Sequence, residues 1–173
     1  ARHDYITVHS GETDLPEVWE LGLWLHYDRN PLVVDTEGDE LPLLESQLIA
    51  HLVPAVVITP WLRLSLDLPV YLLQSGSNAA FVGATDLEGA GIGDIRVIPK
   101  VTLFTQRRSE VLGETRDGLA VAIVLPASIP TGDRDRLQGE AFRLEPMVAL
   151  DYMLADGFGF GVNLGALIRN SNT

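Results

Sequence analysis

Long stretches of this chain place an apolar residue at every second position. The clearest runs from Leu62 to Leu72, where leucine or valine fills each even-numbered position and Arg63, Ser65 and Asp67 stand between them. Side chains of a β-strand point alternately to opposite faces, so one face of such a strand is entirely aliphatic. Strands of ordinary globular proteins have about 5–6 residues, whereas a strand that crosses a bilayer needs about 9–11. Length and alternation together predict membrane-spanning strands.

The same pattern predicts seven strands in the chain. We expect them at residues 18–28, 46–58, 61–74, 92–105, 118–129, 141–154 and 158–169. Residues 4–9 are a candidate for a short eighth strand, and 1–17 are otherwise an N-terminal periplasmic segment. The predicted fold is all-β, a transmembrane antiparallel up-and-down β-barrel of seven or eight strands in this chain. Residues 1–173 would form one domain.

Composition limits the partners and the compartment. The chain has 173 residues, a net charge of −12 and no cysteine. An acidic chain lacks the clustered Lys and Arg of a nucleic-acid surface, so we expect no nucleic-acid partner. Disulfides and thiolate metal sites are excluded, and no apolar run is long enough for a transmembrane helix. The N-terminus has no apolar signal-peptide core, so a secretory signal would already have been removed.

A soluble β-sandwich or a lipocalin-like barrel also has one apolar and one polar face, with the apolar face turned inward. Two features favour lipid contact instead. Aromatic residues near the strand ends could form a lipid-facing belt; they are Trp19, Tyr27, Trp61, Phe104, Phe142, Tyr152 and Phe158. The opposite faces carry small residues and charges of both signs, as a crowded lumen would; the charged residues are Arg63, Asp67, Asp94, Arg96, Lys100, Arg143, Glu145 and Asp151.

The predicted connections alternate imperfectly between long and short. Outer-membrane barrels have short periplasmic turns and longer extracellular loops. We therefore expect the acidic loop 29–44 and the loops 75–91 and 130–140 to be extracellular, with the N-terminus in the periplasm. Five prolines fall inside predicted strands, where each lacks a backbone donor; they are Pro54, Pro69, Pro99, Pro126 and Pro146. Local bulges or edges are the preferred explanation, and kinks that shape the barrel wall are the alternative.

Three segments carry a resemblance to known proteins: residues 25–33 (LHYDRNPLV), 91–100 (GIGDIRVIPK) and 125–133 (LPASIPTGD). They resemble strings found in OmpA-like and transporter-like outer-membrane barrels of Gram-negative bacteria, particularly those of the myxobacterial type. The resemblance covers most of residues 4–169. It implies a location in the bacterial outer membrane. Since such proteins usually have more strands, it also implies that the chain is the N-terminal part of a longer barrel.

The motifs that could carry chemistry have simpler explanations. The Gly91-x-Gly93-Asp94 string is not followed by a helical pattern, so we interpret it as a turn rather than a phosphate loop. The acidic residues of 35–40 lack the spacing of a calcium loop and are expected to be solvated. His26, His51, Ser65 and Asp67 could be imagined as a hydrolase site, but no local motif supports a nucleophile. We predict no enzymatic activity, no cofactor and no metal.

Two functions remain open. One is a passive channel or transporter for small solutes, in which the charged lumen residues set the selectivity. The other is a structural or anchoring barrel, plugged by those side chains, that binds partner proteins through its loops or its periplasmic side. Outer-membrane lipid and lipopolysaccharide are the expected surroundings, and other envelope proteins are possible partners. Strand number separates the two functions, because eight strands leave an interior filled by side chains and many more leave a channel.

Overall fold

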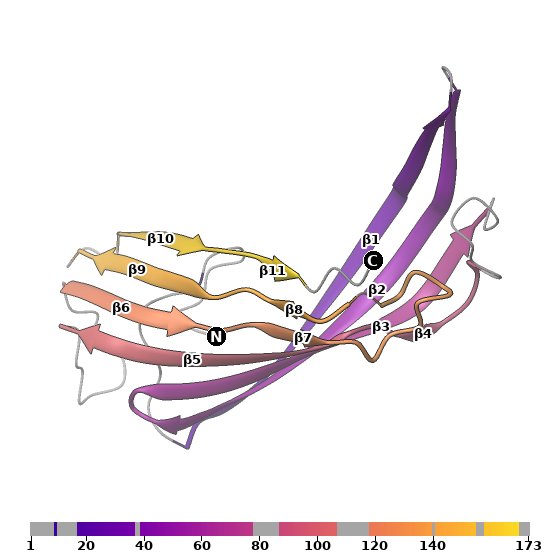
Figure 1. The fold of residues 1–173 in the computed structure, drawn as a ribbon. Helices are drawn as coiled ribbons and strands as arrows, with labels where there is room; N and C mark the ends of the chain where they lie inside the picture. Colours follow the sequence, from indigo (N-terminus) through magenta and orange to yellow (C-terminus); the bar gives the residue numbers. More distant parts are fainter. Residues whose placement is uncertain are drawn as a thin grey trace.

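The computed structural model describes residues 9, 17–36, 39–77, 87–106, 118–139, 141–154 and 158–169. These residues form one antiparallel sheet that curls into a half-barrel (Figure 1). Within them, no helix is long and apolar enough to cross a membrane. The strands are β1 (Trp19–Thr36), β2 (Asp39–Thr59), β3 (Leu62–Gly76), β4 (Gly91–Ile92), β5 (Ile95–Thr105), β6 (Gly118–Val124), β7 (Ala127–Ile129), β8 (Arg143–Leu144), β9 (Met147–Met153), β10 (Gly159–Gly165) and β11 (Ile168–Arg169).

Seven strands in the order β1-β2-β3-β5-β6-β9-β10 make up the main path of the sheet. The short strands are continuations of these seven: β4 leads into β5, β7 follows β6, β8 leads into β9, and β11 follows β10 (Figure 1). The predicted all-β fold of seven antiparallel strands is thereby confirmed. The predicted strand five corresponds to β6 with β7, strand six to β8 with β9, and strand seven to β10 with β11.

The prediction of an acidic loop at 29–44 is wrong for most of its length. The first two strands continue through it as a long hairpin arm, and Asp35 lies opposite Glu40 near its tip. The arm contains Val33 and Val34, whose β-branched side chains favour extended backbone despite the acidic residues nearby. An irregularity in register lies between Arg29 and Leu32, beside Asn30 with a φ of 50°. Figure 1 shows these two strands as the longest of the sheet.

Four proline carbonyls accept hydrogen bonds where the neighbouring strand is interrupted. Gly93 donates to Pro69 (2.8 Å), Leu125 to Pro99 (3.0 Å), Glu145 to Pro126 (2.9 Å) and Ala166 to Pro146 (3.0 Å). A proline has no backbone donor, so a regular ladder cannot continue on both of its sides. Pro126 and Pro146 themselves lie in the gaps between two strands. Pro54 pairs with Leu21 of β1, but the pairs of β2 with β3 pass from Leu52–Leu68 to Ala55–Ser65 and skip it. Each of the five prolines thus accompanies an interruption of a neighbouring ladder.

The polar face of the sheet is more buried than its aliphatic face. We call inner the face that carries Lys100, Ala122 and Asp151, and outer the opposite face. Ala122 and Ala149, paired across β6 and β9, are fully buried, and Lys100 and Asp151 are each only 2% exposed. On the outer face, Leu21, Leu23 and Leu25 of β1 are 65–71% exposed. The sheet therefore buries its small and polar face and exposes its aliphatic one.

The half-barrel has two edge strands in the part of the chain that the structure describes. They are β1 and β10, and no ladder joins them. With seven alternating strands both run in the same direction, so pairing them directly would be parallel. An antiparallel closure needs an odd number of further strands. Of the candidate strand 4–9, only His9 lies within the described residues. Its backbone is held by the Asn163 side chain, with N···Oδ1 2.7 Å and Nδ2···O 2.9 Å.

Because the inner face is packed with small residues, we predict that enlarging a side chain there lowers stability far more than the same change at a neighbouring outer position. Ala149 packs in a buried cluster with Ala122 and Val124, so we expect Ala149→Leu to destabilise the fold by about 1–3 kcal/mol through overpacking. Val148, the preceding residue, lies on the outer face and is 40% exposed. Val148→Leu should change the free energy of unfolding by less than about 0.5 kcal/mol. Urea unfolding of both variants measures the difference, and equal effects would contradict the assignment of faces.

Candidate functional site

The inner face gathers charged residues from strands far apart in the sequence. Cross-strand pairing sets Arg63 opposite Lys100, Asp67 opposite Arg96, and Ala120 opposite Asp151. Arg63, Lys100 and Asp151 are buried, at 2–4% exposure. The structure places all eight charged residues proposed from the sequence on this face or at its strand interruptions. Charges in such a position need partners, because desolvation disfavours an isolated ion.

An ion pair joins the first strand to the third across β2. The Arg63 guanidinium contacts the Glu20 carboxylate at 2.6 Å, with the arginine side chain 5% exposed. Glu20 lies on the polar face of residues 18–28, between Trp19 and Leu21, and is not among the site residues predicted from the sequence. The contact passes over the small residue Ala55 of β2 and joins residues 43 positions apart. Alternation within a single strand therefore could not predict it.

A second group of charged side chains lies farther along the sheet. Glu145 contacts Arg96 through Oε2 at 3.2 Å and Arg143 through Oε1 at 2.9 Å. All three side chains are about one quarter exposed, so they face open space on the inner side rather than a dry core. One carboxylate therefore bridges two guanidinium groups that belong to different strands.

The histidines pair with carboxylates near them. His51 Nδ1 lies 2.8 Å from Asp67 Oδ1, and His26 Nε2 lies 3.0 Å from Asp28 Oδ1. A catalytic triad would need a nucleophile hydrogen-bonded to the histidine and a carboxylate on the other ring nitrogen. His51 and Asp67 supply the histidine and carboxylate of such an arrangement. Ser65, the nucleophile considered from the sequence, lies opposite Ala55 and Ile98 in the ladders.

Three glutamines form a buried polar cluster that the sequence did not reveal. Gln74 Oε1 accepts hydrogen bonds from Gln47 Nε2 and Gln138 Nε2, both at 3.3 Å. Gln74 Nε2 donates to the carbonyls of Leu87 (3.0 Å) and Arg136 (2.6 Å). Little in the sequence indicated this cluster, because alternation puts Gln47 on the polar face of residues 46–58 but Gln74 on the aliphatic face of residues 61–74, and Gln138 lies in a predicted loop. Register irregularities between β2 and β3, near Leu44 and Leu48, shift the alternation and bring Gln74 beside Gln47.

Residues 130–139 fold back over the inner face and are tied to it by two short motifs. The Asp94 carboxylate accepts hydrogen bonds from the backbone N–H groups of Thr131 (3.1 Å) and Gly132 (2.9 Å). The Thr131 hydroxyl donates to the Gly93 carbonyl and accepts from the Ile95 N–H. The Gly91-x-Gly93-Asp94 and Pro130-Thr-Gly-Asp133 strings, each a turn motif in the sequence, thus bind each other. We call residues 130–139 the inner loop.

Glycine is required where the inner loop closes on itself. A Cβ on Gly132 would lie 2.3 Å from the Gln138 carbonyl oxygen, which is backbone and cannot move aside. On β4, a Cβ on Gly91 would lie within 1.9 Å of the Gln138 side-chain oxygen, so the Gln138 side chain would have to move. The shape of the loop therefore depends on Gly132, and the position of the Gln138 side chain depends on Gly91.

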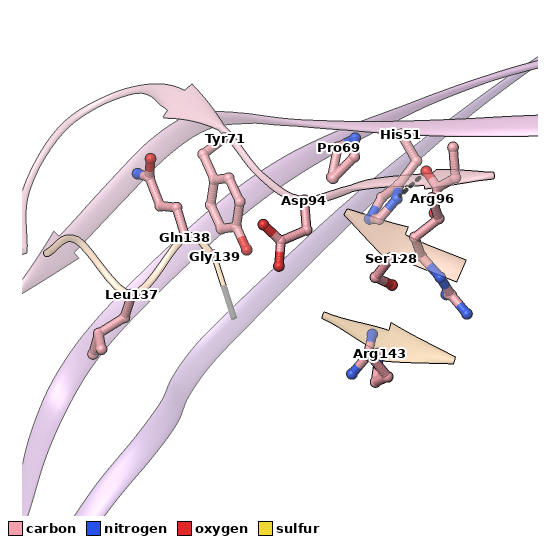
Figure 2. A pocket seen from close by; sticks show the side chains of 11 residues that line it. His51, Pro69, Tyr71, Asp94, Arg96, Ser128, Leu137, Gln138, Gly139 and Arg143 are labelled. Carbon is pink, nitrogen blue, oxygen red and sulfur yellow. Dashed lines mark hydrogen bonds and ion pairs between the residues drawn. The ribbon is translucent and has the colours of Figure 1, made fainter. Parts of the chain in front are cut away.

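A cavity of about 200 Å³ lies between the inner loop and the sheet (Figure 2). Its walls combine ionic groups with aromatic and apolar side chains. The lining residues are His51, Asp67, Pro69, Tyr71, Asp94, Arg96, Ser128, Leu137, Gln138, Gly139 and Arg143. Four of the eight predicted lumen residues meet here, namely Asp67, Asp94, Arg96 and Arg143. Glu145 contacts two of them, Arg96 and Arg143, without lining the cavity. The other three, Arg63, Lys100 and Asp151, lie elsewhere on the inner face.

The predicted aromatic belt lies on the exposed side of the strands. All seven residues are at least 40% exposed, from Tyr152 at 40% to Trp19 at 78%. Phe158 and Phe160 pack edge to face with ring centroids 5.4 Å apart. Among the described residues, no cluster of three or more His, Asp or Glu is arranged to hold a metal ion. The structure does not describe the side chains of the acidic segment 35–40. The expectation that these residues are solvated and form no calcium loop therefore stays a prediction.

Removing the Asp94 carboxylate tests the attachment of the inner loop. Asp94→Ala leaves two backbone N–H groups without their acceptor, and we expect trypsin to cut after Arg134 and Arg136 about tenfold faster. That factor corresponds to about 1.4 kcal/mol, within the usual cost of an unsatisfied donor. Glu45→Ala removes an exposed carboxylate on β2, away from both cleavage sites; it is the matched control and should leave the cleavage rate unchanged. Equal rates for the two variants would show that Asp94 does not hold the loop.

Comparison with known proteins gives one match. Residues 44–173 match the family described as "Putative MetA-pathway of phenol degradation". No curated protein and no solved structure matches the chain significantly. The match agrees with the barrel-like part of the resemblance, because this family often consists of outer-membrane barrel-like proteins, and it lends nothing to the OmpA-like part. It begins in β2 and includes the inner loop and every later strand, well over half of the chain, so the chain belongs to this family.

Proposed function

We propose that this chain forms the wall of an outer-membrane β-barrel through which small solutes pass. The observation that carries the proposal is the inverted burial of the two faces. A soluble sheet buries its aliphatic face and exposes its charges. Here Arg63 and Lys100 are buried while Leu21 and Leu23 are largely exposed. Water would make such an aliphatic surface costly, whereas lipid would stabilise it.

The dimensions of the strands support the same environment. Phe142 and Tyr152 are both exposed and lie ten positions apart along the β8–β9 strand. At about 3.3 Å per residue that is roughly 33 Å, which projects to about 25 Å at the tilt of barrel strands. The height equals that of the apolar band of outer-membrane barrels. Lipid and lipopolysaccharide are then the natural surroundings of the outer face.

The inner face provides the path for the solute and a constriction on it. Arg96, Arg143 and Glu145 face open space on this side, and the inner loop covers part of the face beside them. Charged groups on a pore wall select solutes by their charge and size. The family description refers to phenol degradation, so small aromatic compounds are the first solutes to consider.

A plugged structural barrel is the second candidate. The observation in its favour is the buried Arg63–Glu20 pair together with the interlocked glutamines, which fill part of the inner face with side chains. In that case the loops would bind envelope proteins and no current would flow. Conductance therefore separates the two candidates.

A charge on the outer face tests the contact with lipid. Val148, 40% exposed, lies between the aromatic residues Phe142 and Tyr152. In a bilayer, Val148→Arg should destabilise the protein by about 2–4 kcal/mol. An exposed valine on a water-facing surface would tolerate the change within about 0.5 kcal/mol. Urea unfolding of the full protein in lipid vesicles gives the value.

Val33→Arg is the matched control for this experiment. Val33 has nearly the same exposure, 39%, but lies in the hairpin arm beyond the aromatic residue Tyr27. We expect little change in the free energy of unfolding. If both arginine variants are as stable as the parent protein, the outer face does not contact lipid and the proposal fails.

Release of the inner loop should widen the path. We expect the full protein in a planar bilayer to show steady single channels, and Asp94→Ala to raise their conductance because the loop loses its anchor on β4 and β5. Asp135→Ala should conduct as the parent protein does. Folded protein that is silent in all three forms would exclude the channel and favour the plugged anchor.

A further inference from the structure

Two arginines flank a serine in one row across three neighbouring strands. In the ladders, Arg96 of β5 lies opposite Ser128 of β7, and Ser128 lies opposite Arg143 of β8. Residues directly opposite in antiparallel strands have Cα atoms about 4.5–5.5 Å apart. Two guanidinium groups thus stand on either side of a hydroxyl, and all three residues line the cavity under the inner loop. We call Arg96, Ser128 and Arg143 the arginine row.

Among the described residues, three guanidinium groups and two carboxylates, those of Glu145 and Asp67, lie at the arginine row. Arg96 and Arg143 share one carboxylate, that of Glu145. The next position of the row, opposite Arg143, is Arg169 of β11, which adds a third guanidinium. Both carboxylates that line the cavity already have partners: Asp67, which lies opposite Arg96, contacts His51, and Asp94 accepts two N–H groups of the inner loop.

The Arg96 guanidinium has N–H groups that could bind a ligand. A guanidinium carries five N–H groups, and the contact of Arg96 with Glu145 is a single one at 3.2 Å. Within the described part of the chain, the Arg96 Nε is buried and has no hydrogen-bond partner. A ligand oxyanion above Ser128 would be within reach of guanidiniums on both sides and of the serine hydroxyl. Charge-assisted hydrogen bonds of this kind are the strong ones in proteins.

The opposite end of the cavity is suited to an apolar body. Figure 2 shows Tyr71 and Leu137 on the side away from Arg96, Ser128 and Arg143. Pro69 adds a further apolar wall. The volume of about 200 Å³ is enough for one ring, since a cavity of about 150 Å³ in another protein holds benzene.

We propose that this cavity binds a small organic carboxylate, with the carboxylate on the arginine row and an apolar or aromatic body against Tyr71 and Leu137. The site would make the proposed channel selective for small aromatic acids over neutral phenols. The proposal rests on the proposed function only for the role of the site, because binding is measured on detergent-solubilised protein without any passage across a membrane. If the protein binds the carboxylate but conducts no solute, the channel is overturned and the site is not. If it conducts solutes but does not bind the carboxylate, the site is overturned and the channel is not.

Titration of the full, detergent-solubilised protein with benzoate, followed by ligand-observed NMR, tests the site. Benzamide and phenol have the same ring without the negative charge, so they are the matched ligands. We expect benzoate to bind at least about tenfold more tightly than either, and its affinity to fall as salt is added. Benzoate that binds no better than benzamide would overturn the proposal.

Variants of the arginine row locate the binding. Arg96→Gln should weaken benzoate about tenfold or more and leave the weak binding of benzamide unchanged, and Arg96→Lys should give an intermediate affinity because it keeps the charge without the planar fork. Arg134→Gln removes one positive charge from the exposed part of the inner loop, outside the cavity lining, and should bind benzoate as the parent protein does. If Arg96→Lys and Arg96→Gln both retain the parent affinity, the arginine row is not the site.

Discussion

The pairing of buried charges on the inner face is the constraint on which the rest of the structure depends. Arg63 is held by Glu20 across the width of β2, and removal of one partner from such a pair usually costs about 3–5 kcal/mol. The contact requires the first three strands to keep their register and requires small residues such as Ala55 between them. An aliphatic outer face follows from the same alternation, since the strands have only two faces.

The inner loop is the second element that organises the site. Its attachment uses backbone groups at both ends: Asp94 accepts two loop N–H groups, and Gln74 donates to the Arg136 carbonyl. This closes one side of the cavity and sets Leu137 and Gln138 opposite the charged wall. Flux and ligand binding would then be linked, because the same loop would constrict the path and form a wall of the binding cavity.

The sequence predicted which residues share a face better than it predicted where the strands end. Alternation placed Arg63, Lys100 and Asp151 together on one face, and the ladders have the same parity. It failed at 29–44, where acidic residues suggested a loop although Leu32, Val33 and Val34 extend the hairpin. Negative charge lowers strand propensity only weakly, whereas pairing of a long hairpin satisfies the whole backbone. The gaps at Pro126 and Pro146 followed from the missing proline donor.

From the sequence alone came the antiparallel all-β class and, away from register irregularities, the face on which each side chain lies, because both depend on a local period of two. Contacts between distant segments were decided only by the tertiary structure. Asp94 was proposed as a lumen charge, and folding turns it into an acceptor for residues 37 and 38 positions away. The arginine row likewise exists only through the registers of β5, β7 and β8. Register and loop docking are long-range properties, and alternation along one strand carries no information about them.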